Sequence, residues 1–202
     1  MAKKSAKARK PSPVRKVDLS KLGIPSIDPA TIANPDIRNF LSHTGNLESQ
    51  AKAFWMLGVE AEQRMDWTGA IDCYQVVLRI QPADPLSRYF STHNMAFALI
   101  QLKRFEEAVP YAEAAIRLNE GWPFGYHTLG VALNQLGKYP EAAYAFLTAI
   151  WKGGQKSNDS WRHLQAMLGA HPDVLVAVPR LAGDVEQVRR ALESRGLLPR
   201  TH

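Results

Sequence analysis

The stretch that decides the fold runs from Tyr126 to Phe146 and reads YHTLGVALNQLGKYPEAAYAF. Two earlier stretches follow the same plan: FWMLGVEAEQRMDWTGAIDCY at 54–74 and THNMAFALIQLKRFEEAVPYA at 92–112. In each, a small residue is followed nine positions later by an aromatic and three positions after that by an alanine. The small residues are Gly58, Ala96 and Gly130, the aromatics Trp67, Phe105 and Tyr139, and the alanines Ala70, Ala108 and Ala142. Three copies in one register predict three repeated structural units.

The intervals between copies also predict where the units differ. Ala70 and Ala108 are 38 residues apart, whereas Ala108 and Ala142 are 34 apart. The four extra residues fall at 85–88, directly after Asp84, which is a good helix N-cap, and they begin with Pro85, which suits a first helical turn. Four residues are about one helical turn. We therefore expect the first helix of the second unit to be one turn longer.

This pattern resembles the tetratricopeptide repeat, a helix–turn–helix unit of about 34 residues. The resemblance covers roughly residues 51–155, and the second copy departs most from the pattern, with Thr92 and Ala112 at aromatic positions and Glu120 in place of a closing proline. It implies an all-α fold: a right-handed α-solenoid of three helical hairpins. It also implies a concave face, lined by the first helix of each hairpin, that binds a peptide or a partner protein.

The domain organisation follows from composition. We expect a disordered basic tail and linker at 1–35, a possible short helix within 36–46, three repeats at 47–155 and capping helices at 156–202. The repeat helices are expected at 47–64, 67–81, 84–103, 105–119, 123–136 and 139–152. Beyond them we expect a helix at 159–169 capped by Asn158 or Asp159, another between Pro172 and Pro179, and a last one at Asp184–Arg195.

Charge is concentrated at the N-terminus. The chain carries a net charge of +6, and residues 1–21 alone carry +7, so the remainder is about −1. The basic tail residues are Lys3, Lys4, Lys7, Arg9, Lys10, Arg15 and Lys16. The tail lacks interleaved aromatics and an amphipathic face, which favours loose neutralisation of a polyanion, such as nucleic acid or an acidic protein, over base stacking or membrane insertion. A merely solubilising extension remains the alternative.

No pattern of catalysis, metal binding or cofactor binding is found, so we expect the protein not to be an enzyme. The segment GGQKS at 153–157 follows a helix and lacks the spacing of a phosphate loop. Cys73, the single cysteine, is expected to be a structural thiol, and it weakly indicates a reducing, cytoplasmic setting. No apolar run is long enough for a transmembrane segment, and no secretory signal is recognised.

The resemblance also implies which side chains line the groove. The candidate peptide-binding residues are Trp55, Val59, Phe90, His93, Asn94, Phe97, Phe124, His127, Val131 and Asn134. The same mapping adds Lys52, Glu62, Gln63, Ile100, Gln101 and Gln135. Phe97, in the middle unit, is expected to be the most enclosed anchor. His93 and His127 occupy equivalent positions and are expected either to hydrogen-bond in the groove or to be partly buried structural residues.

One branch of the family clamps the C-terminal carboxylate of large chaperones with lysine, arginine and asparagine. The matching positions here are Trp55, Val59, Asn94, Phe124 and Thr128, and only Asn94 agrees. A carboxylate needs cationic donors, so we reject the clamp.

The predicted function is therefore an adaptor, assembly factor or chaperone that binds an apolar or amphipathic segment of another protein. One alternative is self-coverage of the groove by Leu19–Ile27 or the C-terminal helices. Another is a nucleic-acid- or ribosome-associated adaptor acting through the tail. A minor alternative is a chaperone resembling those of type III secretion translocators.

Overall fold

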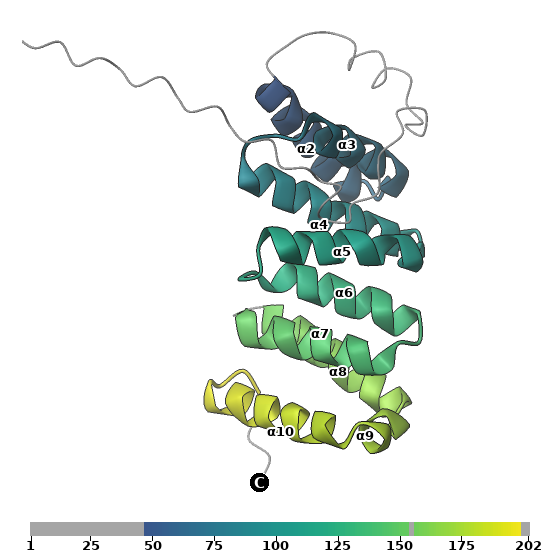
Figure 1. The fold of residues 1–202 in the computed structure, drawn as a ribbon, viewed down its shortest axis with the longest axis vertical. Helices are drawn as coiled ribbons and strands as arrows, with labels where there is room; N and C mark the ends of the chain where they lie inside the picture. Colours follow the sequence, from purple (N-terminus) through teal and green to yellow (C-terminus); the bar gives the residue numbers. More distant parts are fainter. Residues whose placement is uncertain (1–46, 154–155, 199–202) are drawn as a thin grey trace, which may run out of the picture.

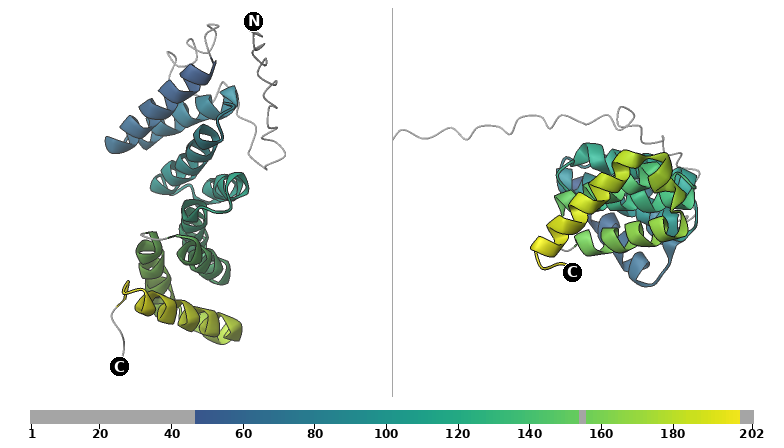
Figure 2. Two further views of the ribbon diagram at one scale, coloured as in Figure 1. Left: turned by 90° about the vertical axis from the view of Figure 1, so that its left-hand side faces the viewer. Right: turned by 90° about the horizontal axis from the view of Figure 1, so that it is seen from below.

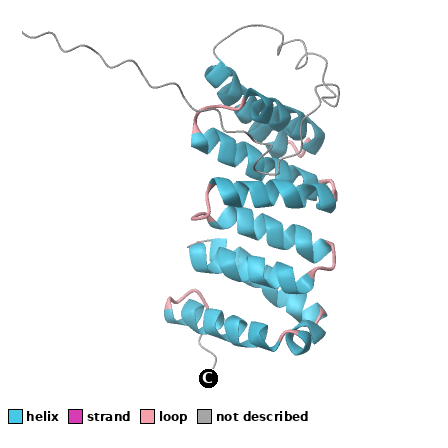
Figure 3. Cartoon of the chain, viewed as in Figure 1, coloured by secondary structure: helices cyan, strands magenta, loops and turns pink. Residues whose placement is uncertain are grey.

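The computed structural model describes residues 47–153 and 156–198, and every regular element in these ranges is a helix (Figure 3). The repeat helices are α2 (Leu47–Gln63), α3 (Trp67–Ile80), α4 (Pro85–Gln101), α5 (Phe105–Leu118), α6 (Pro123–Gln135) and α7 (Tyr139–Lys152). The C-terminal helices are α8 (Lys156–Ala170), α9 (Asp173–Ala177) and α10 (Pro179–Ser194). The expected all-α solenoid is confirmed.

The helices stack as consecutive hairpins, from α2 at one end to α10 at the other (Figure 1). From α2 to α8, each helix packs against the next along the chain, and α10 packs against both α7 and α9, as the two turned views of Figure 2 also show. The first helices of the units also contact one another: α2 contacts α4, α4 contacts α6, and α6 contacts α8. These first helices form one layer of the stack, and this layer carries the candidate site.

Local sequence explains the helix ends. The Asp84 carboxylate accepts hydrogen bonds from the backbone N–H groups of Leu86 and Ser87, and Pro85 occupies the first turn. Helix α4 has 17 residues and α6 has 13, which confirms the extra turn relative to the third unit; α2 also has 17 residues.

The turn inside each hairpin repeats one backbone conformation. Met65, Lys103 and Gly137 stand at equivalent positions, and all three have positive φ angles, of 59°, 59° and 73°. Glycine adopts this conformation without steric cost, whereas a residue with a Cβ adopts it at a steric cost. The intervals between these residues equal those between the repeated alanines, so the turns independently confirm the register.

Close packing explains the small residues. A Cβ at Gly58 would lie 2.5 Å from Tyr74 Cε1, and one at Gly130 would lie 2.7 Å from Phe146 Cδ1. Both aromatic rings are fully buried. The first helix of each of these hairpins therefore approaches the second so closely that only glycine fits.

Helices α8 to α10 cover the end of the array. Trp161 and Leu164 of α8 and Leu181 of α10 join the core formed by Leu147 and Ile150 of α7. Two predicted boundaries were wrong. Helix α8 begins at Lys156 and not at an Asn158 or Asp159 cap, and α10 begins at Pro179 and not at Asp184.

The early start of α10 has a physical reason. Proline is tolerated in the first turn because its missing N–H would have no intrahelical partner there. Leu181, on the added turn, is completely buried, and that burial favours the longer helix.

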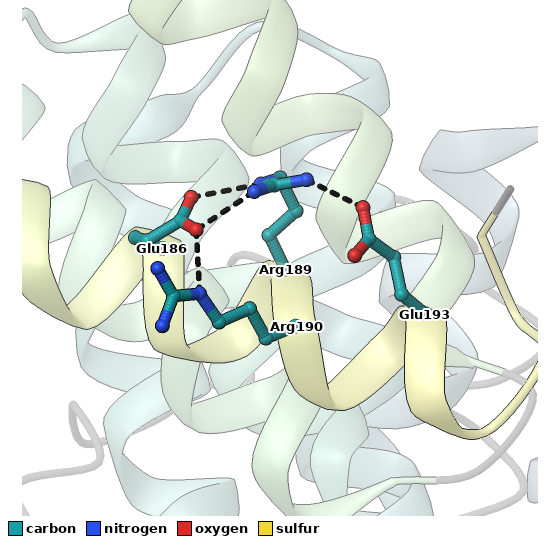
Figure 4. A network of polar contacts seen from close by, with 4 residues as sticks. All are labelled: Glu186, Arg189, Arg190 and Glu193. Carbon is teal, nitrogen blue, oxygen red and sulfur yellow. Dashed lines mark hydrogen bonds and ion pairs between the residues drawn. The ribbon is translucent and has the colours of Figure 1, made fainter. Parts of the chain in front are cut away.

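One side of α10 carries a network of ion pairs that is only partly exposed (Figure 4). Arg189 bridges Glu186 and Glu193, and Arg190 also contacts Glu186. These hydrogen bonds lower the pKa of Glu186 to about 2. Because the pairs lie three or four residues apart, they support the helical conformation locally.

Candidate functional site

A pocket of about 370 Å³ opens on the layer of first helices. We call it the groove pocket. Its lining is Glu62 from α2, Phe90, His93, Asn94 and Phe97 from α4, and Phe124, His127 and Thr128 from α6. Three successive units thus contribute to one cavity, as expected for a binding surface built across a solenoid.

Aromatic rings form much of the wall and its surroundings. The Phe90 ring contacts two tryptophans, with centroids 6.1 Å from Trp55 and 5.3 Å from Trp122. The His93 and Phe124 rings meet nearly edge to face at 5.8 Å. Such arrangements stabilise ring positions beyond simple burial, so the wall is held in shape.

Phe97 corrects one expectation. It is 37% exposed, whereas Phe90 and Phe124 are both less exposed. Its ring packs against Trp67 at 5.7 Å. Phe97 therefore lies at an open edge of the pocket and is not its most enclosed anchor.

A chain of hydrogen bonds crosses the polar side of the pocket. Asn94 Nδ2 donates to the Tyr74 hydroxyl at 3.1 Å, and Asn94 Oδ1 lies 3.0 Å from His93 Nδ1. His93 Nε2 lies 3.0 Å from Thr128 Oγ1. An amide oxygen can only accept, so His93 carries its proton on Nδ1, and Nε2 accepts from the threonine hydroxyl. His93 is thus engaged by the protein's own groups.

His127 is engaged as well. Its Nδ1 lies 2.8 Å from Ser160 Oγ of α8, and its ring lies 5.1 Å from that of His163. The C-terminal helices therefore help to orient one wall of the groove pocket. Both histidines make the structural hydrogen bonds that were one of the two expectations for them.

Glu62 is the acidic residue of the pocket. Burial raises the pKa of its carboxyl group, and a hydrogen bond with the Tyr74 hydroxyl partly offsets that effect. One carboxylate oxygen, Oε1, is buried without a hydrogen-bond partner. A buried acceptor without a donor is unfavourable, so this atom stands out in the lining.

Other predicted groove residues lie elsewhere. Trp55 and Val59 line a separate hollow of about 630 Å³ along α2, together with Met56 and Leu57. Val131 packs against the core formed with the C-terminal helices. Asn134 is partly buried, and its backbone carbonyl accepts from the N–H of Gly137 in the turn after α6.

Trp122 was missed by the sequence reasoning. It stands directly before Pro123, which begins α6, and its ring contacts both Tyr89 and Phe90. The sequence signal that could have indicated its role is an aromatic residue directly before the proline that begins a helix.

The basic tail, the linker anchors at 19–27 and the possible helix at 36–46 lie outside the described residues. Within 47–153 and 156–198, no helix is long and apolar enough to cross a membrane. The same ranges hold no cluster of three or more histidine, cysteine, aspartate or glutamate side chains fit to bind a metal ion. Cys73 is buried. Burial, and to a smaller extent the negative charges of Asp72 and Asp66, raise the pKa of its thiol to about 11. This shift disfavours the reactive thiolate.

A stack of helical hairpins with a pocket across its first helices defines the class: a helical-repeat scaffold, whose members bind other proteins. Comparison with known families agrees, since the tetratricopeptide repeat model matches residues 92–121. This is the second copy, which departs most from the pattern. The hairpin stack and this match confirm that the chain is built from tetratricopeptide repeats.

Curated relatives point the same way. The small glutamine-rich tetratricopeptide repeat-containing protein 2 of Saccharomyces cerevisiae is 30% identical over 117 residues, covering 57% of this chain and 33% of that protein. Its namesake from Mycosarcoma maydis is 30% identical over 93 residues, covering 46% and 25%. The peroxisomal targeting signal receptor of Candida glabrata is 28% identical over 114 residues, covering 56% and 19%. The chain spans a third or less of the length of each.

Proposed function

We propose that the protein is an adaptor or chaperone-like scaffold that binds an apolar or amphipathic segment of another protein in the groove pocket. The observation that carries the proposal is the aromatic lining by Phe90, Phe97 and Phe124 of a cavity shared by three units. Aromatic residues in well-packed pockets contribute most of the affinity in typical interfaces.

The relatives support the binding role without naming a partner. One is named as a receptor for a targeting signal, which is a feature carried by another protein. The proposal assigns no catalytic step to the chain, and it keeps the cytoplasmic setting expected from its single, buried cysteine.

The test uses peptides selected on the full chain from a displayed library of random peptides of about twelve residues, long enough to span neighbouring units. Selected peptides are titrated against the parent and against Phe124→Ala and Phe90→Ala. Each substitution should weaken binding by about 2 kcal/mol, or roughly thirtyfold in Kd. Unfolding curves establish that each variant remains folded.

Tyr144→Ala is the matched control. Tyr144 is 39% exposed on α7, outside the groove pocket, so its loss removes a comparable exposed ring from another surface. The control should bind like the parent. If the two phenylalanine variants also bind like the parent, the groove pocket is not the binding site.

A further inference from the structure

The described lining of the groove pocket includes an acidic side chain and no lysine or arginine. Of the eight described residues that line it, Glu62 is the acid. Arg64, which directly follows α2, pairs with Glu60 at 3.0 Å on the exposed surface. Glu62 also stands in the last turn of α2, where the helix dipole places partial negative charge. The cavity is therefore electrostatically suited to a cation.

Among the buried side-chain polar atoms of the described pocket lining, only Glu62 Oε1 lacks a hydrogen-bond partner. Asn94 is occupied by Tyr74 and His93, and the ring nitrogens of His93 face Asn94 and Thr128. Glu62 Oε1 has no such partner, although it is buried. Because Oε1 is enclosed, an entering N–H donor reaches it once the Glu62 side chain turns toward the cavity, and a charged donor would then supply the strongest hydrogen bond.

The apolar part of the lining also suits a cation. Lysine and arginine heads bind over aromatic faces, within about 6 Å of the ring centre. Phe90, Phe97 and Phe124 supply three rings around the cavity. The methylene stem of a lysine or arginine would bury against these rings while its head reached the carboxylate.

We propose that the groove pocket recognises a lysine or arginine side chain of the bound segment, with its cationic head at Glu62 and its stem among the three phenylalanines. This specificity rests on the proposed peptide-binding function. The carboxylate and the open aromatic rings are complementary in charge to such a head group, whereas an acidic or purely aliphatic anchor would leave the Glu62 oxygen without a donor.

The experiment uses the same random peptide library, selected on the full chain and on Glu62→Gln. Glutamine keeps the size of the side chain and an oxygen for Tyr74 but removes the charge. Peptides selected on the parent should share one lysine or arginine at an anchor position, in spite of the net charge of +6 on the chain. That shared residue should be absent from peptides selected on Glu62→Gln.

A double-mutant cycle completes the test. Glu62→Gln, or replacement of the peptide's basic anchor by methionine, should each weaken binding about tenfold or more, and both together should cost little beyond either alone. Glu106→Gln, which removes the same charge from an exposed position of α5, should leave binding unchanged.

The inference is overturned if the selected peptides share no basic anchor, if Glu62→Gln binds them as the parent does, or if Glu106→Gln weakens binding equally. Peptides that still lose affinity with Phe124→Ala would then leave the proposed function intact. If neither the phenylalanine nor the Glu62 variants matter, both proposals fail together.

Discussion

Gly130→Ala should destabilise the third hairpin. The new Cβ would lie 2.7 Å from two carbons of the Phe146 ring, which is completely buried. Carbon atoms pack best at about 3.5–4.0 Å, so either the ring must leave its rotamer or α6 and α7 must separate. Overpacking of this kind costs roughly 1–3 kcal/mol, while replacing a helical glycine by alanine returns about 0.5–1 kcal/mol. We expect a net loss of about 1–2 kcal/mol.

Gly183→Ala is the matched control. Gly183 lies inside α10, and a Cβ there would meet no atom within 4 Å. This substitution should therefore only raise the free energy of unfolding through the higher helix propensity of alanine, by about 0.5–1 kcal/mol. Denaturant unfolding followed by circular dichroism measures both, and thermal midpoints should shift by about 2–4 °C per kcal/mol in a chain of this size. A Gly130→Ala protein as stable as the parent would refute the close approach of α6 and α7.

Three further outcomes are expected. Lys103→Gly should raise the free energy of unfolding by about 1 kcal/mol, because glycine relieves the positive φ of 59° in that turn, and an unchanged denaturation midpoint would contradict this. Deleting residues 1–17 should leave the melting temperature nearly unchanged, since the segment has few apolar residues, but should abolish retention on heparin at low salt; strong retention by the truncated protein would reveal a basic face on the body. Binding of a basic-anchored peptide, titrated by fluorescence anisotropy at stepwise pH, should weaken as pH falls. Burial raises the pKa of Glu62, so its carboxylate loses its charge at a higher pH than is usual for glutamate. Affinity that is constant with pH would argue against a charged Glu62 in the complex.

Much of the fold could be predicted because its signals are local. The Asp84–Pro85 cap and the repeated alanines at 70, 108 and 142 act within one turn or one hairpin, and the structure has the helices that they indicate. The start of α10 was harder to predict. Pro179 and Gly183 resemble linker residues, and only burial of Leu181 against the neighbouring core makes the longer helix favourable.

The groove was predictable in outline and not in detail. The resemblance placed Phe90, His93 and Phe124 on one surface, and the structure brings them around one cavity. It could not show that Trp122 would cover Phe90, or that Phe97 would stay open. Those outcomes depend on where one helix hairpin sits on the next.

The sequence by itself determined the repeat, its register and the extra turn of α4, since capping and close packing of small residues are set by neighbours a few positions away. Only the tertiary structure decided which polar atoms of the pocket are satisfied. His93 of the second unit forms a hydrogen bond with Thr128 of the third, while Glu62 Oε1 has no donor. Hydrogen bonds need groups within about 3 Å, and that proximity between residues distant in sequence arises only when the hairpins stack.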